Sequence, residues 1–316
     1  MELEHESMYN PNYTIQQLLQ KSLILLDKPP RISSHEATAF VKKILNVKKT
    51  GHSGTLDPNV SGVLIIAINK ATRFLEYLNS LDKKYVCLMR LYKKNLKLED
   101  VQKVVNEKFI GSIKQRVPEI SAVRKQTRSR TIYSIKILEV KNNSMTTDVL
   151  FIAHVEKGTY IRVLCEDIGK ELNCIGKMLE LRRISVGKYD EENYKLTTLH
   201  ELYFAYYLFK QYGNDKLLKE ILKPIEFFCD FPKIKIKPEF EKKALHGDIL
   251  KLHQLDNQSM KFLENYLKGN INNYNLKIGI FSQDNELICV AKISRKKNNV
   301  LIIPKKVFME LKDDKL

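Results

Sequence analysis

The residues with the clearest capacity for chemistry lie in one short segment, Gly51-His52-Ser53-Gly54-Thr55-Leu56-Asp57-Pro58. It places an imidazole, two hydroxyl groups and a carboxylate among glycines, which permit close ligand approach. Pro58 restricts the backbone at Asp57, so the segment can present that carboxylate at a fixed angle as a nucleophile or a base. A tight turn in which Asp57 binds neighbouring amides explains the same residues.

A second candidate is Arg162 in the run Gly158-Thr159-Tyr160-Ile161-Arg162, where it opens a predicted helix. The helix dipole prefers anions at that position, so an arginine there favours pairing with a carboxylate or a phosphate. An exposed ion pair with Glu166 or Asp167 is the alternative.

A third candidate is a basic stretch over residues 114–136. Its cations, set against the single acid Glu119, are Lys114, Arg116, Arg124, Lys125, Arg128, Arg130 and Lys136. Such density suits contacts with a phosphate backbone, although an ordinary solvated loop is possible. The whole chain has 54 Lys+Arg against 37 Asp+Glu, a net charge of +17. That excess favours polyanionic partners, of which RNA, DNA and an anionic membrane surface are all compatible.

Other sites and locations are not expected. The histidines lack carboxylate or cysteine partners at ligand spacing, and no P-loop, GxGxxG or HExxH motif occurs, so we expect no metal and no cofactor. The five cysteines form no CxxC pair, which is typical of buried thiols in a reducing cytosol. No apolar run approaches the roughly 18 residues of a membrane helix, and the polar, acidic N-terminus argues against a signal peptide. We expect a cytoplasmic protein.

Apolar periodicity and capping signals predict the elements that position these residues. Strands are predicted at residues 23–26, 63–68, 85–91, 132–140 and 149–156. Helices are predicted after Ser33-x-x-Glu36, at 98–109, 162–172 and 175–182, and from Thr198 to Tyr212, whose tyrosines we expect to pack in the core. Residues 114–130 are predicted to be a loop. A proline cluster at 224–238 suggests a domain boundary, followed by a small all-β module. The mixture without βαβ regularity indicates an α+β fold.

Seven segments in order resemble the TruB-type pseudouridine synthase family, and within it the archaeal relatives of dyskerin, the catalytic subunit of H/ACA guide ribonucleoproteins. They are LLDKPPRISSHEATAFVKKIL, KKTGHSGTLDPNVSGVLIIAINKATR, KKYVCLMRL, ISAVRKQTRSRTIYSIKILEV, KGTYIRVLCEDIG, MLELRRISVG and the Pro-Ile-Glu of KPIEFF. The resemblance implies three parts: an N-terminal segment, residues 1–20, that packs on the last domain; a catalytic domain, residues 21–228, with a mixed, mostly antiparallel sheet; and a C-terminal PUA domain, residues 229–316, a small β-barrel that binds RNA. The match is weakest in this last part.

The resemblance also implies roles for individual residues. Asp57 matches the catalytic aspartate, Tyr85 the tyrosine that stacks on the flipped base, and Arg162 the arginine paired with the aspartate. Leu181 matches a leucine that lines the pocket, and His52 a position that contacts RNA beside it.

Two further features follow from the same resemblance. Lys28, with Pro29, matches a motif that buttresses the aspartate loop. Residues 116–130 match the substrate-gripping thumb, and its implied RNA contacts are Arg116, Arg124, Lys125 and Arg128. Relatives usually read Arg-Pro-Pro where this chain has Arg116-Val117-Pro118.

The resemblance implies isomerisation of uridine to pseudouridine in rRNA or tRNA, directed by H/ACA guide RNA together with Nop10, Gar1 and an L7Ae-type protein. The alternative to core packing for Tyr203, Tyr206 and Tyr207 is that they are exposed and contact Nop10. Three alternatives remain: a stand-alone synthase acting on tRNA, a non-catalytic RNA-binding scaffold, and a DNA-binding regulator. For the last, no helix-turn-helix or zinc finger is recognisable.

Overall fold

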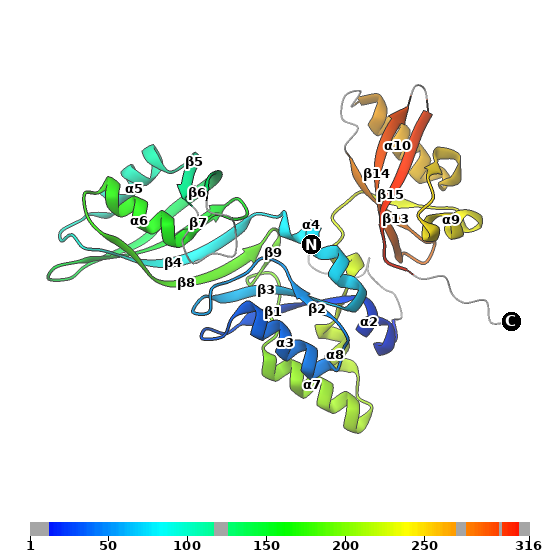
Figure 1. The fold of residues 1–316 in the computed structure, drawn as a ribbon, viewed down its shortest axis with the longest axis horizontal. Coiled ribbons are helices and arrows are strands. Elements are labelled where there is room, and N and C mark those ends of the chain that lie inside the picture. Colours follow the sequence, from blue (N-terminus) through cyan, green and yellow to red (C-terminus); the bar gives the residue numbers. More distant parts are fainter. Residues whose placement is uncertain (1–12, 117–125, 270–275, 297–298, 310–316) are drawn as a thin grey trace. The chain divides into compact units, whose positions relative to one another are not determined.

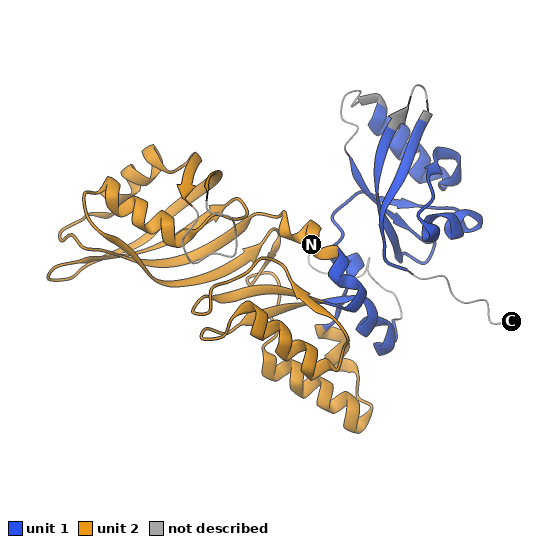
Figure 2. Cartoon of the chain, in the orientation of Figure 1, with its two compact units in different colours: residues 1–23, 68–73, 222–316 blue, residues 24–67, 74–221 orange. Residues whose placement is uncertain are grey.

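The computed structural model describes residues 13–116, 126–269, 276–296 and 299–309. The chain separates into two compact units, which Figure 2 distinguishes by colour. Unit 1 comprises residues 1–23, 68–73 and 222–316, and unit 2 comprises residues 24–67 and 74–221. The functional division into segments 1–20, 21–228 and 229–316 stays a prediction.

Unit 2 is built on a large curved sheet (Figure 1). Its strands are β1 (Ser22–Lys28), β2 (Thr50–His52), β3 (Ser61–Ile68), β4 (Lys83–Leu91), β5 (Gly111–Arg116), β6 (Thr127–Asn142), β7 (Thr147–Val155), β8 (Gly176–Val186) and β9 (Tyr189–Asp190). The order is β10-β1-β3-β8-β4-β7-β6-β5, where β10 is Lys223–Pro224, with β2 on β3 and β9 on β8. The β3–β8 pair is parallel, whereas β4–β8, β4–β7, β6–β7 and β5–β6 are antiparallel. The predicted mixed, mostly antiparallel sheet is therefore confirmed.

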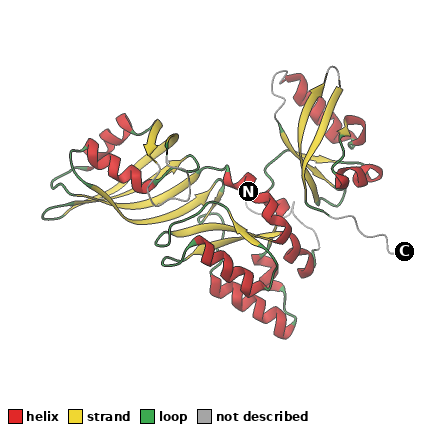
Figure 3. Cartoon of the chain, viewed as in Figure 1, coloured by secondary structure: helices red, strands yellow, loops and turns green. Residues whose placement is uncertain are grey.

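Helices cover this sheet, so that strands and helices mix along the unit as an α+β fold (Figure 3). They are α3 (Ser34–Leu45), α4 (Leu75–Asn79), α5 (Leu98–Lys108), α6 (Ile161–Glu171), α7 (Leu199–Tyr212) and α8 (Lys216–Ile221), whereas the 3-10 turn η1 (Asn69–Phe74) belongs to unit 1 except for its last residue. The predicted capping boxes at Ser33 and Thr198 are both present. One core joins α5 and α6 to β4, β6 and β7, and includes the buried Tyr85, Cys87 and Met89 on alternate positions of β4.

Three predictions for unit 2 were wrong. Residues 175–182 form strand β8, because pairing with β4 along its length outweighs the helix propensity of Met, Leu, Glu and Arg. Residues 114–130 are not all loop, since β5 reaches Arg116 and pairs with β6 from Thr127. Tyr203 and Tyr207 of α7 are exposed rather than packed in the core.

Unit 1 contains a second sheet of five strands, in the order β11-β13-β14-β15-β12. Its strands are β11 (Lys233–Lys235), β12 (Leu250–Lys251), β13 (Lys277–Phe281), β14 (Leu287–Lys296) and β15 (Asn299–Val307), and β10 (Lys223–Pro224) pairs instead with β1. Its helical elements are α2 (Ile15–Lys21), η2 (Ile225–Phe228), η3 (Pro238–Phe240), α9 (Glu241–His246), η4 (Leu252–Gln254) and α10 (Asn257–Gly269). The C-terminal module is thus built on strands as predicted, but α9 and α10 show that it is not all β.

A buried polar cluster joins the start of the described chain to the C-terminal sheet within unit 1. The Glu226 carboxylate accepts hydrogen bonds from the Tyr13 hydroxyl at 3.1 Å and from the Leu287 amide at 2.8 Å. Lys21 pairs with Glu286 at 3.1 Å. Burial, followed by the charge of Glu226, raises the pKa of Tyr13. In the described parts of both units, no helix has the length and apolar character needed to cross a membrane.

Candidate active site

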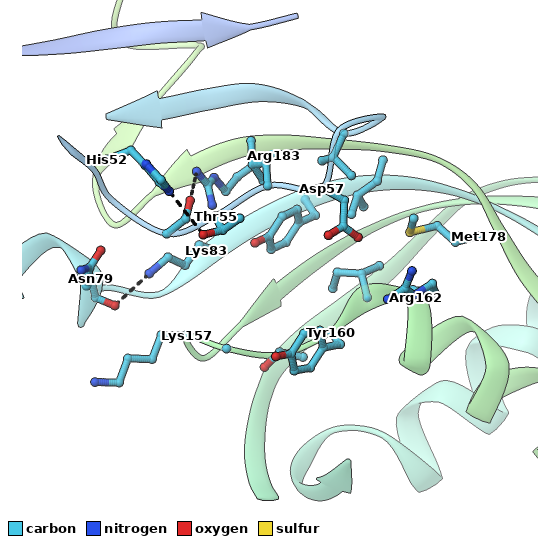
Figure 4. Close-up of a pocket in the computed structure, with 18 residues that line it drawn as sticks. His52, Thr55, Asp57, Asn79, Lys83, Lys157, Tyr160, Arg162, Met178 and Arg183 are labelled. Carbon is cyan, nitrogen blue, oxygen red and sulfur yellow. Dashed lines mark hydrogen bonds between the residues drawn. The ribbon is translucent and has the colours of Figure 1, made fainter. Parts of the chain in front are cut away.

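A pocket of about 530 Å³ opens in unit 2, and five of the predicted site residues line it (Figure 4). These are His52, Asp57, Tyr85, Arg162 and Leu181. They come from the end of β2, from the segment between β2 and β3, from β4, from the start of α6 and from β8. The volume lies in the range of small-ligand sites, so residues far apart in sequence converge on one space that can hold a nucleotide.

Asp57 is exposed at this pocket, while its neighbours on both sides are anchored. Leu56 and Val60 are buried in the core. The Ser34 hydroxyl accepts from the Leu56 amide at 2.8 Å and lies 3.0 Å from the Leu56 carbonyl. The carboxylate therefore stands on a loop whose backbone is fixed by packing and hydrogen bonds, which is how a reactive group is held ready for a substrate.

Lys28 supports the same loop from behind and does not line the pocket. Its side chain is fully buried, and its ammonium donates to the carbonyls of Pro29 at 2.8 Å, Ile32 at 2.5 Å and Pro58 at 3.1 Å. Burial lowers the pKa of Lys28, as does the charge of Arg183, while Glu36 and Asp57 raise it. Lys28 thus holds the carbonyl of the residue directly after Asp57, in the position that the resemblance implies.

Arg183 is the main residue of the site that the sequence analysis missed. It is 1% exposed and donates to the carbonyls of Val63 at 2.8 Å and Gly54 at 3.1 Å, with a longer contact to Ser53 at 3.4 Å. Burial lowers the pKa of the guanidinium, and the neighbouring Tyr85 opposes this shift. An arginine side chain remains charged in proteins, so Arg183 is a buried cation that ties the aspartate loop to β3.

Strand geometry explains how Arg183 could have been found. Side chains alternate between the faces of a strand, so Leu181 and Arg183 share the pocket face of β8. Arg182 lies on the other face and forms ion pairs with Asp27 and Glu191. Residues 175–182 were predicted to be a helix, so the sequence analysis did not place Arg183 on the same face as Leu181.

Tyr85 and Arg162 line the same pocket as Asp57. Tyr85 is 9% exposed and belongs to β4, and Arg162 is half-buried in the first turn of α6. Figure 4 shows that the side chains of Arg162 and Asp57 both lie at the pocket. The implied ion pair between them is not formed, and neither has another ion pair among the described residues.

His52 is held in one tautomer by its neighbours. The Thr38 hydroxyl lies 2.6 Å from the Ser34 carbonyl and donates its only proton there. The His52 Nδ1, 3.2 Å from the same hydroxyl, must therefore carry the ring proton. The other ring nitrogen, Nε2, faces the Thr55 hydroxyl at 3.3 Å. Burial, then the charges of Arg183 and His35, lowers the pKa of His52, so the ring is a neutral hydrogen-bonding group rather than a cation.

Lys83 is a further pocket residue that the sequence analysis did not single out. It is 4% exposed, and its ammonium donates to the carbonyls of Asn79 and Leu81. Burial, together with the charge of Arg183, lowers the pKa of Lys83 to about 8. With Lys157, Arg162 and Arg183 it makes the pocket basic, and Asp57 is the single carboxylate among the described residues that line it.

The two predicted thumb contacts that the structure describes are not part of the pocket lining. Arg116 is exposed at the end of β5, and Arg128 is half-buried on β6, where it pairs with Gln115 in register. Neither lines the pocket. Arg124 and Lys125 lie outside the described residues.

The arrangement combines one accessible carboxylate with an aromatic ring and several cations. A carboxylate can act on a sugar carbon as a nucleophile or remove a proton beside it. The ring of Tyr85 offers a face for a planar base. The surrounding cations suit the phosphates of a nucleic acid.

Known families and solved structures match this geometry. The family described as TruB family pseudouridylate synthase (N terminal domain) matches residues 42–161, and the tRNA pseudouridylate synthase B C-terminal domain matches residues 162–228. The protein called "Probable tRNA pseudouridine synthase B" from Archaeoglobus fulgidus is 40% identical over 92% of this chain and 84% of its own length. Its namesake from Pyrococcus horikoshii is 44% identical over 72% of this chain and 67% of its own length.

Two solved structures share the fold over nearly the whole chain. A chain of "Crystal Structure of a Cbf5-Nop10-Gar1 Complex" has a TM-score of 0.80 and 34% identity, covering 95% of this chain and 91% of that one. A chain of "Structure of H/ACA RNP bound to a substrate RNA containing 2'-deoxyuridine" has a TM-score of 0.79 and 33% identity, with the same coverage. The predicted resemblance is confirmed, and the chain belongs to the TruB family of pseudouridine synthases, enzymes that isomerise uridine in RNA.

Proposed function

We propose that this chain converts uridine to pseudouridine in rRNA or tRNA, with Asp57 as the catalytic carboxylate and an H/ACA guide RNA selecting the target. The observation that carries the proposal is the isolation of Asp57: it is the only carboxylate among the described pocket residues, and its loop is fixed by Lys28, Ser34 and Arg183.

The reaction needs the target uridine to leave its stack before the glycosidic bond is accessible. Tyr85 supplies a face for the extruded base, and Leu181 closes the pocket beside it. The bond between C1′ and N1 breaks, the base rotates, and C5 bonds to C1′. N1 takes up a proton and C5 releases one, so the reaction is an isomerisation without a cofactor.

Asp57 assists this exchange in one of two ways. It either attacks C1′ and forms a transient ester, or it removes a proton from C2′ and leaves a glycal-like sugar. Arg162 supplies a cation in the same pocket as the carboxylate (Figure 4). His52 contacts the RNA beside the pocket, and Arg116, Arg124, Lys125 and Arg128 contact its backbone.

Guide dependence is supported by the similarity to chains solved in H/ACA assemblies over 95% of this chain. The segments LDKPPRISSHEA and Thr50-Gly51-His52-Ser53-Gly54 also resemble the guided branch of the family. The partners in this proposal are Nop10, Gar1 and an L7Ae-type protein, and the location is the cytoplasm. The names of the curated relatives favour a second candidate, a stand-alone synthase for tRNA.

The test is pseudouridine formation by the purified chain on a tRNA transcript and on a guide-complementary RNA, with and without the guide RNA and small partner proteins. Product on the complementary RNA only when guide and partners are present supports the proposal. Product on tRNA without guide, and none on the guided target, transfers the chain to the stand-alone class. Absence of product on both substrates supports a non-catalytic scaffold.

A further inference from the structure

A buried carboxamide lies directly behind the pocket wall that carries Arg162. Gln115 is 2% exposed, although glutamine is rarely buried unless its polar atoms are bonded. It belongs to β5, immediately before the exposed Arg116. Neither the sequence pattern nor the pocket lining singles it out.

The carboxamide holds both backbone groups of one residue. Its Oε1 accepts from the Tyr160 amide at 3.0 Å, and its Nε2 donates to the Tyr160 carbonyl at 3.2 Å. Such a two-point contact fixes the orientation of a peptide as well as its position. The connection spans 45 residues of sequence and joins β5 to the start of α6.

Tyr160 is the residue at which the position of Arg162 is decided. It is the N-cap of α6 and has no side-chain capping hydrogen bond. Its carbonyl also accepts the first helical hydrogen bond, from the Leu164 amide at 3.0 Å. Any movement of the Tyr160 peptide therefore carries the first turn of the helix with it, and Arg162 lies in that turn.

The same turn has a second support at Gly158, whose carbonyl accepts from Arg130 at 3.1 Å. Gly158 has a φ of +75°, and an added Cβ would lie 3.2 Å from the Arg130 guanidinium. The run from Gly158 to Arg162 lines the pocket, so β5 and β6 set this wall from behind.

We propose that Gln115 is a positioning residue for the isomerisation: it sets the Tyr160 peptide, and through it the placement of Arg162 in the pocket with Asp57. This inference rests on the proposed function for its effect on turnover, but not for its effect on the helix start. A displacement of about 1 Å near reacting groups can cost about 100-fold in rate, so loss of the two bonds is expected to slow chemistry by about 10- to 100-fold.

The chain offers a matched control in Gln102. Its Oε1 accepts from the Ile137 amide at 2.8 Å, and its Nε2 donates to the Ile135 carbonyl at 3.1 Å. The contact has the same chemistry as that of Gln115, but it joins α5 to β6, and none of its three residues lines the pocket. Gln102→Met removes these two backbone hydrogen bonds, together with one from Nε2 to the Asn106 side chain at 2.9 Å, and so shows what a merely structural loss does.

The experiment compares Gln115→Met, Gln115→Asn and Gln102→Met with the unaltered protein. Asparagine keeps an amide but is one methylene too short to reach both groups, so it serves if the methionine variant folds poorly. Three quantities are measured for each: the single-turnover rate constant at saturating RNA, the RNA dissociation constant, and amide hydrogen exchange by mass spectrometry.

The proposal expects both Gln115 variants to lose about 10- to 100-fold in rate while RNA affinity stays within about threefold. Exchange should rise at residues 160–164 in these variants and only at 135–137 in Gln102→Met. Equal rates in Gln115→Met and Gln102→Met would overturn it. If the unaltered protein forms no pseudouridine, the proposed function fails. Amide hydrogen exchange then still tests the role of Gln115, because unchanged protection of residues 160–164 in Gln115→Met would overturn the inference.

Discussion

Replacing Arg183 by methionine tests how the pocket is held together. The side chain keeps much of its volume but loses every donor, so the carbonyls of Val63 and Gly54 lose their bonds at 2.8 and 3.1 Å. The aspartate loop would then be tied to the sheet by fewer contacts.

The magnitude follows from two opposing effects. A hydrogen bond from a charged donor contributes about 1.5–3 kcal/mol, so the two short bonds contribute about 3–6 kcal/mol together. Removing a buried cation relieves a desolvation cost of several kcal/mol. Because the carbonyls stay buried without donors, we expect a net loss of about 3 kcal/mol. For a unit of this size that corresponds to a fall in Tm of about 6–12 °C.

The assay is thermal unfolding followed by circular dichroism, with Arg183→Lys beside Arg183→Met. Lysine keeps the charge but has one nitrogen, which cannot replace the fork of the guanidinium, so it should also be destabilised. Arg182→Met is the control, since that neighbouring arginine forms exposed ion pairs with Asp27 and Glu191 and should shift Tm much less. An Arg183→Met variant that melts with the unaltered protein would refute the reasoning.

Three other changes have defined outcomes. Burial lowers the pKa of Lys83 from 10.5 to about 8, so the unfolded chain binds more protons between these values and stability rises with pH. Urea unfolding should show a gain of about 1 kcal/mol in the free energy of unfolding from pH 7 to pH 9, and Lys83→Met should lack this gain. An equal gain in the variant would contradict the assignment. Lys28→Met removes the three hydrogen bonds that the Lys28 ammonium donates to carbonyls around the aspartate loop. It should lower turnover more than RNA affinity, and proportional losses in both would count against a positioning role. Tyr13→Phe removes one bond to the buried Glu226 and should cost about 1 kcal/mol in thermal unfolding, with an unchanged melting curve as the contrary result.

Local patterns predicted much of the fold. Capping boxes located α3 and α7, and apolar runs located β3, β4 and β7, because these signals depend on residues adjacent in sequence. Strand β8 was missed because its helix-forming residues are held extended by pairing with β4. That pairing is a long-range contact, which periodicity in a single segment does not report.

The site residues also differ in whether adjacent residues or only the fold reveal them. Asp57 was singled out because a loop of glycine, hydroxyl residues and proline is unusual in itself, but its catalytic role was predicted from the family resemblance. Arg183 and Gln115 were not found, because an arginine in a basic chain and a glutamine in a polar strand carry no signal until the fold buries them. Burial is what turns these ordinary residues into supports for the pocket.

The most direct test of the central claim is single-turnover pseudouridine formation by Asp57→Asn, measured with the guide RNA and partner proteins that support the unaltered chain. Asp57 is exposed and its loop is held by other residues, so the substitution should leave Tm and RNA affinity unchanged. We predict that the variant binds the target and forms no detectable pseudouridine. Product at a rate within about tenfold of the unaltered protein would contradict the assignment of Asp57 as the catalytic carboxylate.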